Sequence, residues 1–273
     1  MTTPGQSPLG KAVATPDRYD PALLFAMRRA AQREALGLGA TLPFSGADLW
    51  TAYELSWLDS RGKPEVAVAL FSVSADSPSI VESKSLKLYL NGFSQTPFKS
   101  PGAVQRTIAA DLSRAFGGPV EVELVRPAEF ARLRVADLEG ESLDDRDIEV
   151  RDYTPNPGLL TTARDIASET LVSNLFKSNC PVTGQPDWGS VQIRYRGPRI
   201  DRAGLLRYLV SFRQHAGFHE SCVERMFIEV LQRCRPERLT VYARFTRRGG
   251  IDINPFRSNW ERAPAPGART ARQ

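Results

Sequence analysis

Two periodicities of apolar residues alternate along the first half of the chain. Apolar side chains recur at every fourth position from Val104 to Phe116, which predicts a helix over residues 101–116. A similar spacing followed by two glycines predicts another helix over residues 21–36. Alternating or continuous apolar runs between turn residues predict strands. The strands expected in this half cover residues 49–58, 65–73, 80–89 and 120–125.

The second half shows the same kinds of pattern. Two strands, 170–176 and 188–195, are separated by a Pro- and Gly-rich loop and are expected to form a hairpin. Asp201 is expected to cap a helix that runs to about residue 213. The remaining expectations are a helix over 218–233, a strand over 238–246 and an irregular tail from Asn254-Pro255.

The two halves therefore share one outline of strands and helices, which predicts an α+β protein with two similar units side by side. The length of 273 residues suits one large or two medium domains. Residues 1–18 are rich in Thr, Pro, Gly and Ser and are expected to form a flexible arm. The expected modules span 19–135 and 161–273, joined by an acidic, Pro-containing connection over 136–160.

Charge and cysteine content narrow the setting. Thirty-six Lys and Arg residues against 31 Asp and Glu give a net charge of +5, which suits anionic ligands and is weak evidence for nucleic acid. The three cysteines are an odd number without framework spacing, so free thiols in a reducing cytoplasm are expected. Neither a signal peptide nor an apolar run of about 18 residues is present, so no membrane partner is expected.

The loop between the two strands of the predicted hairpin holds the most informative chemistry. Cys180 ends one strand and Asp187 begins the next, so a thiol and a carboxylate are expected close together. This pair suggests a nucleophile with a proton-transfer partner. The competing interpretation is a buried small hydrophobe beside a turn aspartate. The polar, Pro-bounded loop favours the catalytic interpretation.

A metal site is the alternative for the histidines. His215, His219 and Cys222 are spaced to share a helix face, and Cys180 would complete a zinc site of the Cys/His kind. Gly217 argues for a helix break between the histidines, and the spacing matches no common structural zinc motif. Two unrelated histidines at a helix junction are the simpler interpretation.

Two charged segments have open interpretations. Residues 82–85 place a carboxylate and an ammonium group beside a ligand, or form an exposed strand of mixed charge. The arginines and glycines of 244–250 wrap phosphates, or form a basic surface loop or an RNA-binding patch. Aromatic residues are not interleaved there in the way that base stacking requires. The chain contains no G-x-G-x-x-G dinucleotide fingerprint.

Several segments, in order and spacing, closely resemble the NADPH-dependent 7-cyano-7-deazaguanine reductases, the nitrile reductases of queuosine biosynthesis, in their long, two-module form. The segments are 81–89, 178–180, 185–189, 218–220 and 242–250. The resemblance covers about residues 19–259. It implies tandem modules of the tunnelling fold, with antiparallel sheets and helices packed on one face, and no metal in this branch.

The resemblance also implies roles for individual residues. The expected reaction reduces a nitrile to a primary amine with two NADPH, through a covalent thioimide on Cys180 and with Asp187 as proton donor. The residues implied to hold the deazaguanine are Val81, Glu82, Ser83, His219 and Glu220. Those implied to hold NADPH are Ser83, Lys84, Arg248 and Gly249.

Two other functions stay open at this point. A zinc-dependent GTP cyclohydrolase-like enzyme shares the fold, and stoichiometric zinc in purified protein would identify it. An RNA-binding module would show a salt-dependent gel shift with tRNA, although nucleic acid is not an expected partner. The expected assembly is a homodimer, because a single two-module chain leaves open sheet edges that a second chain can cover.

Overall fold

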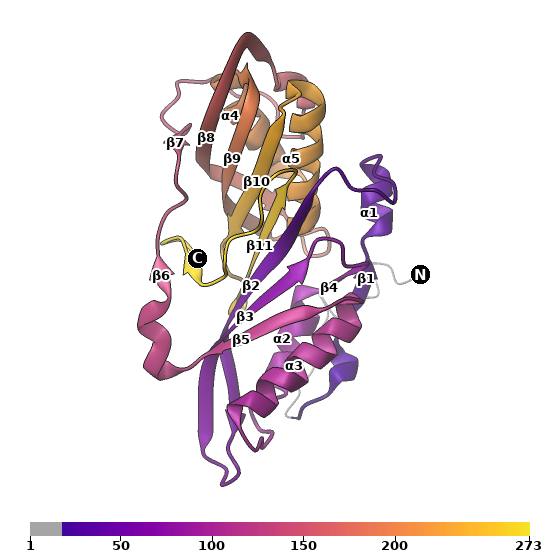
Figure 1. Cartoon of the computed structure of the whole chain (residues 1–273), viewed down its shortest axis with the longest axis vertical. Coiled ribbons are helices and arrows are strands. Elements are labelled where there is room, and N and C mark those ends of the chain that lie inside the picture. The colour runs from indigo at the N-terminus through magenta and orange to yellow at the C-terminus, as the bar shows by residue number, and fades with distance from the viewer. Residues whose placement is uncertain (1–17) are drawn as a thin grey trace.

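The computed structural model describes residues 18–273, so the expected arm lies outside the described residues except for residue 18. One eight-stranded sheet runs through the molecule in the order β5-β3-β2-β11-β10-β9-β8-β7 (Figure 1). Its strands are β2 (Ser45–Leu58), β3 (Pro64–Ser74), β5 (Val120–Val125), β7 (Glu141–Ser142), β8 (Thr162–Asn179), β9 (Pro186–Ile200), β10 (Arg238–Phe245) and β11 (Ile251–Ser258). Neighbouring strands are antiparallel except for the short β7, which is parallel to β8.

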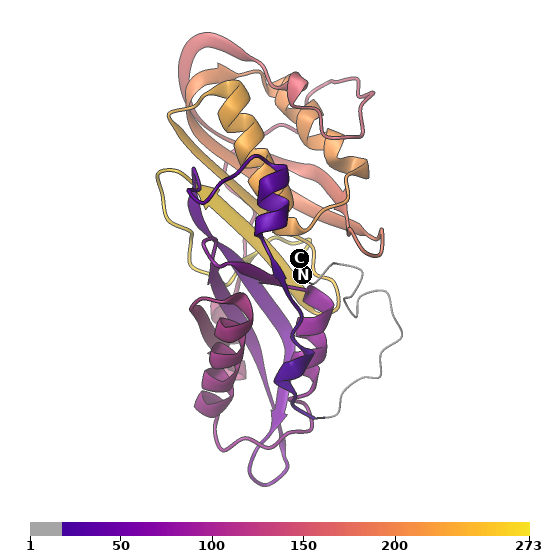
Figure 2. The same ribbon diagram turned by 90° about the vertical axis from the view of Figure 1, so that its right-hand side faces the viewer.

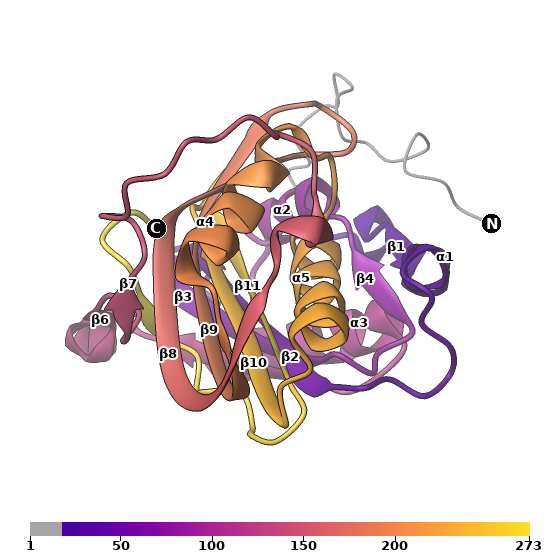
Figure 3. The ribbon, with the colours of Figure 1, turned by 90° about the horizontal axis from the view of Figure 1, so that it is seen from above.

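Four helices pack on one face of this sheet (Figures 2 and 3). They are α2 (Ser83–Asn91), α3 (Pro101–Phe116), α4 (Arg202–Ser211) and α5 (His219–Cys234). Helix α3 has the predicted bounds because its signals are local. The Ser100 side chain accepts from the amide of Ala103, and Gly117 ends the helix at φ 77°.

Two hydrophobic cores lie under these helices, one in each half of the sheet. The core under α2 and α3 also contains Ile251 and Ile253 of β11. The strand of this sheet that comes last in the sequence therefore completes the core of the first half. On the opposite face the loop residues Leu133, Leu138 and Ala263 cover smaller clusters. The halves therefore meet through the β2–β11 pair in one continuous sheet.

The α+β class and most predicted elements are confirmed. Residues 170–176 and 188–195 lie within the β8–β9 hairpin, and the Asp201 side chain caps α4 through the amides of Ala203 and Gly204. A 3₁₀ turn, Phe212–Gln214, continues α4 to about the predicted end. The remaining short elements are the 3₁₀ turn Pro127–Arg132, β6 (Arg134–Val135), β12 (Ala268–Arg269) and a second 3₁₀ turn, Pro157–Leu159.

The predicted helix over 21–36 is wrong. The segment is a 3₁₀ turn (Pro21–Leu23), then β1 (Ala26–Arg28), then the short helix α1 (Ala30–Ala35). Strand β1 pairs with β4 (Ser79–Val81), and this long-range pairing overrides the helical spacing of the apolar residues.

The predicted strand over 80–89 is wrong after Val81. The Glu82 carboxylate accepts hydrogen bonds from the amides of Lys84 and Ser85, at 2.7 and 2.9 Å, and so begins α2. Leu86, Tyr89 and Leu90 then face the core at helical spacing.

The expected irregular tail is also wrong, because residues 251–258 form the strand β11 at the centre of the sheet. Proline lacks a ladder donor and usually stands at a sheet edge. Here the regular pairing between β10 and β11 stops at Phe256, just before Pro255 is reached. The Asn254 side chain accepts from the amide of Phe245 instead, at 3.2 Å.

Within residues 18–273, none of the helices is both long enough and apolar enough to cross a membrane.

Candidate active site

The loop between β8 and β9 is a closed turn that begins with Cys180. The Cys180 amide donates to the Gln185 carbonyl at 2.8 Å, and the Gly184 amide donates to the Cys180 carbonyl at 3.0 Å. Gly184 has φ 68°, a left-handed conformation that glycine adopts without steric cost. The turn holds the backbone of Cys180 in a fixed position at the end of β8.

The Cys180 thiol lies in a ring of hydrogen-bond donors. Burial alone would raise its pKa, but hydrogen bonds from the Thr183 hydroxyl, the amides of Thr183 and Val182, and the Arg248 side chain outweigh it and lower the pKa of this thiol. A thiol in such a setting reaches its nucleophilic, deprotonated form more readily than an ordinary cysteine. The other two thiols differ, because burial raises the pKa of Cys222 to about 12 and that of Cys234 to about 11.

Asp187 is the second residue of β9 and is 3% exposed. Its Oδ1 lies 2.8 Å from Nε of Arg248, and its Oδ2 lies 3.4 Å from Nε2 of His219. The His219 ring stacks on Phe245, with ring centroids 3.9 Å apart. The carboxylate is therefore held between a guanidinium and an imidazole.

These groups surround one narrow pocket. Cys180, Asp187 and Arg248 line one side of it. Val81 and Ser83, at the junction of β4 and α2, line a second side, and the start of α5 supplies His219 and Glu220. The free volume is about 20 Å³, roughly enough for a single water molecule. The hairpin, the β4–α2 junction and α5 thus bring together side chains that are far apart in sequence.

Comparison with known proteins places the chain in a family. A family model described as "Nitrile reductase, 7-cyano-7-deazaguanine-reductase N-term" matches residues 15–124, and one described as "QueF-like protein" matches residues 186–264. A protein of Burkholderia vietnamiensis is 58% identical over 272 residues, covering 99% of both chains. One of Paraburkholderia phytofirmans is 59% identical over 273 residues, covering 99% of this chain and 100% of its own.

Both relatives, and one of Bordetella bronchiseptica that is 59% identical over 268 residues and 98% of both chains, are named NADPH-dependent 7-cyano-7-deazaguanine reductase. The chain belongs to the NADPH-dependent 7-cyano-7-deazaguanine reductase family. A solved structure titled archaeosine synthase QueF-Like in the apo form is 14% identical, with a TM-score of 0.32, covering 36% of this chain and 97% of its own. That distant likeness adds nothing to the assignment.

Some of the residues to which the resemblance gives a binding role do not line the pocket. Glu82 is 1% exposed and uses both carboxylate oxygens to cap α2, so it does not line the pocket. Lys84 and Gly249 do not line it either. Glu220 is therefore the glutamate of this reductase chain that faces the space beside Cys180 and Asp187.

Gly249 lies in a tight turn next to the pocket. Arg248 and Ile251 exchange backbone hydrogen bonds, and the two glycines between them have φ values of 60° and 77°. Two successive positive φ values define the hairpin turn that glycines favour. A Cβ on Gly249 would lie 2.8 Å from Nζ of Lys87, so the glycine lets this turn approach α2 closely.

The structure bears on the zinc site considered for the histidines and on the phosphate- or RNA-binding role considered for the arginines. His215 follows the turn after α4 whereas His219 begins α5, so they do not share one helix. Among residues 18–273, no three His, Cys, Asp or Glu side chains are arranged to hold a metal ion. Arg244 donates to the Ala136 carbonyl at 3.0 Å, and Arg248 binds Asp187, so these two arginines are engaged within the protein.

Sequence reasoning missed several contributors to the site. Thr183 and Val182 support the thiol, Gln185 accepts from Arg248 at 2.9 Å, and Phe245 stacks on His219. A threonine three residues after a candidate nucleophile, in a turn closed by glycine, was the available signal for Thr183. Trp188, the neighbour of Asp187 on β9, does not line the pocket because successive residues of a strand face opposite sides.

Proposed function

We propose that this chain reduces the nitrile of 7-cyano-7-deazaguanine to the aminomethyl group of 7-aminomethyl-7-deazaguanine, with NADPH as reductant, in the biosynthesis of queuosine in tRNA. Full-length identity of 58–59% to reductases of that name supports the reaction. The observation that carries the mechanism is the Cys180 thiol, held among four donors in the same pocket as Asp187.

The first step is addition of the Cys180 thiolate to the nitrile carbon. The sulfur–carbon bond forms as one carbon–nitrogen π bond breaks, and the nitrogen takes a proton to give a thioimide. Asp187 is the proton donor in this proposal, because it shares the pocket with the thiol and the other carboxyl group there, Glu220, is assigned to the base. His219, 3.4 Å from Asp187, orients that carboxyl group.

Arg248 is the side chain that makes room for the substrate. A bicyclic base cannot enter a space of about 20 Å³, so a wall must move when it binds. The Arg248 side chain is 32% exposed, whereas Asp187 is 3% exposed. When Arg248 swings away from Asp187, the pocket widens on the side of the thiol and the carboxyl group.

Glu220 is the proposed acceptor for the base. A deazaguanine presents a ring N–H and an exocyclic amine as two adjacent donors, and one carboxylate can accept from both. Glu220 is 3% exposed and lines the pocket from the first turn of α5. Within residues 18–273, His219 Nδ1 has no hydrogen-bond partner, so it is available to the same ligand.

Residues on the pocket and next to it in sequence fit NADPH. Lys84 and Arg248 supply positive charge for its phosphates, and the glycine turn at 249–250 lets a backbone approach them. Bound NADPH supplies one hydride per molecule. Four-electron reduction of a nitrile needs two hydrides. The thioimide carbon would take the first, after which the carbon–sulfur bond breaks, the Cys180 thiolate is restored and an imine is left to take the second.

We also propose tandem tunnelling-fold modules over 19–135 and 161–273, connected by 136–160. In the eight-stranded sheet and the helices on its face, each half contributes two strands, then two helices, then one or two further strands, which supports that division. A homodimer would cover open edges, because within the described residues β5 has a partner on one side only and β8 is covered over two residues. A monomer in light scattering would contradict the homodimer.

The three free thiols fit a cytoplasmic location.

The proposed reaction is tested by its stoichiometry. Purified protein is mixed with 7-cyano-7-deazaguanine and excess NADPH, and NADPH absorbance and the product mass are followed together. Two NADPH consumed per aminomethyl product support the proposal. No NADPH consumption, or a hydrolysed product, would contradict it.

A further inference from the structure

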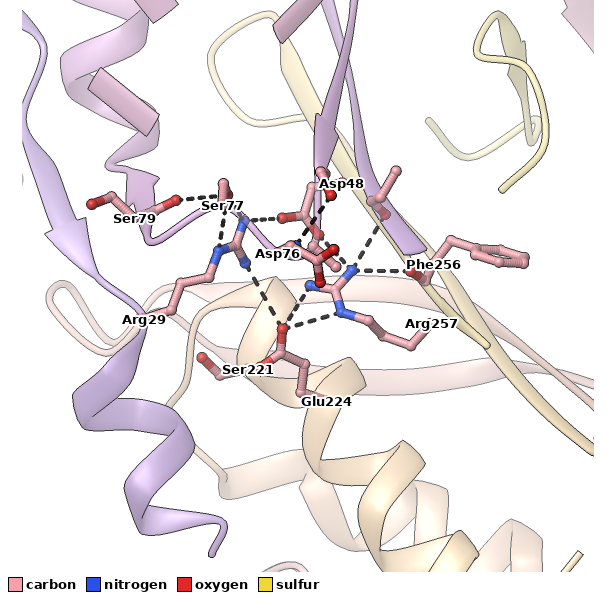
Figure 4. Close-up of polar contacts among 12 residues, drawn as sticks. Arg29, Asp48, Asp76, Ser77, Ser79, Ser221, Glu224, Phe256 and Arg257 are labelled. Carbon is pink, nitrogen blue, oxygen red and sulfur yellow. Dashed lines mark hydrogen bonds and ion pairs between the residues drawn. The ribbon is translucent and has the colours of Figure 1, made fainter. Parts of the chain in front are cut away.

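A cluster of buried charges lies where the two halves of the chain meet (Figure 4). Asp48 of β2 binds Nη2 of Arg29 at 2.5 Å and Nη1 of Arg257 at 2.8 Å. Glu224 of α5 binds Nη2 of Arg257 and Nη2 of Arg33, at 2.8 and 2.7 Å. All five residues are at most 9% exposed. The cluster therefore joins the segment after β1 to the central strands β2 and β11 and to helix α5.

Arg29 also holds the segment that leads to one wall of the pocket. Its amide donates to the Pro78 carbonyl at 3.0 Å, and its guanidinium donates to the Ser77 hydroxyl at 3.1 Å. The Ser77 hydroxyl in turn donates to the Ser79 carbonyl at 3.1 Å. Ser79 begins β4, which ends at Val81 on the pocket.

Glu224 holds the opposite wall. It lies four residues, about one helical turn, after Glu220, so the two carboxylates project from neighbouring turns of α5. Its Oε1 is 3.9 Å from Nη1 of Arg29. Arg29 thus touches both the helix that bears Glu220 and the segment that leads to Val81.

The composition of the cluster argues for a geometric role. Three guanidinium groups and two carboxylates leave water on folding, and buried ion pairs commonly contribute little net stability compared with apolar side chains of similar volume. What such a network does supply is a fixed arrangement, because each guanidinium group donates to its carboxylates in only a few geometries. Recognition of a base edge by one carboxylate needs that kind of precision.

We propose that Arg29 and Glu224 are positioning residues for substrate recognition, which fix the Glu220 side of the pocket against the Val81 and Ser83 side. The inference rests on the proposed function, since Glu220 is itself the proposed acceptor of the base. Loosening the cluster lets α5 shift relative to β4, so the substrate loses affinity. We expect a smaller effect on NADPH. Ser83 and Lys84 stay fixed to Glu82 at the start of α2, and Arg248 and Gly249 stay in a turn closed by the backbone bonds between Arg248 and Ile251.

The test compares Glu224→Gln and Arg29→Lys with a matched control in the full-length enzyme. Glu169 is the control, because it also binds two arginines, Arg199 at 2.6 Å and Arg202 at 2.9 Å, through a side chain that is 11% exposed. It lies on β8 ten residues before Asn179, about 30 Å along the strand from the active-site loop. We expect Glu169→Gln to keep both KM values.

In the two cluster variants we expect KM for the nitrile to rise roughly tenfold, the effect of losing one hydrogen bond, about 1.4 kcal/mol, between Glu220 and the base. KM for NADPH should change less than about twofold, a split that general loss of stability would not produce. An equal rise in both KM values, or an unchanged KM for the nitrile, overturns the proposal.

Two further variants keep the outcome decisive. Ser77→Ala removes the side-chain link from the Arg29 guanidinium to Ser79 without altering a charge and leaves the Arg29 amide bonded to Pro78, so it tests the proposal if Glu224→Gln does not fold. It should also raise KM for the nitrile selectively, and no effect would count against the positioning role of Arg29. Glu220→Gln is measured in parallel. If Glu220→Gln leaves KM unchanged, the proposed function of that residue fails; if it alone raises KM, only the positioning role fails.

Discussion

Removal of one donor from the Cys180 thiolate should slow covalent addition without altering the loop. Thr183→Val replaces the hydroxyl that bonds the sulfur with a methyl group of similar size and keeps both turn amides. The turn itself is held by the bond from the Cys180 amide to the Gln185 carbonyl at 2.8 Å. Burial raises the pKa of the Cys180 thiol and the donors lower it, so loss of one donor moves the pKa upward.

The size of the effect follows from the energy of that bond. A hydrogen bond to a charged group contributes about 1.5–3 kcal/mol, and about 1.4 kcal/mol corresponds to a factor of ten. Three donors remain in the variant, so we expect the lower end, a roughly tenfold slower addition at neutral pH. The rate should recover as pH rises, because deprotonation then no longer limits it.

Stopped-flow measurement of adduct formation across a pH series, without NADPH, checks this prediction. Thr183→Ser is the matched control, since it keeps the hydroxyl and loses only the methyl group, and it should follow the wild-type profile. A Thr183→Val profile that overlays the wild type would refute the role assigned to this donor ring.

Three other predictions concern the same pocket. Glu220→Gln should weaken nitrile binding more than NADPH binding, by about 1.5–3 kcal/mol, in an equilibrium titration with each ligand. Burial first and Asp48 second raise the pKa of Glu220 against the opposing Arg29 and His219, so wild-type affinity should fall as pH falls through that raised value, and the Gln variant should lose this dependence. Asp187→Asn should slow adduct formation strongly while nitrile binding survives; a near-wild-type rate would leave Asp187 as a turn residue. Cys222→Ala and Cys234→Ala should keep turnover, since burial raises the pKa of both thiols, and inactive but folded variants would contradict that.

Features with local signals could be predicted from the sequence. All the signals for helix α3 lie within residues 100–117: the capping serine, the first-turn proline, the apolar stripe and the terminal glycine. The Cys180 to Asp187 loop is equally local, which is why the hairpin brings the two residues to one pocket as expected.

Features that depend on distant partners could not be predicted. Strand β11 is fixed by pairing with β2, about 210 positions away at the contact between Arg257 and Ala47. The buried pair of Arg33 and Glu224 spans 191 positions. From the sequence, Glu82 and Glu220 were both candidates to bind the deazaguanine. The structure distinguishes them, because Glu82 caps the start of α2.

The covalent bond to Cys180 is the central claim, and intact-mass measurement tests it most directly. The protein is incubated with 7-cyano-7-deazaguanine in the absence of NADPH, and the modified residue is located by peptide mapping. The account predicts a mass increase equal to that of the whole nitrile, because addition across the carbon–nitrogen bond loses no atom, with the label on Cys180 and none in Cys180→Ala. No mass increase in protein that turns over the nitrile, or a label on Cys222 or Cys234, would contradict it.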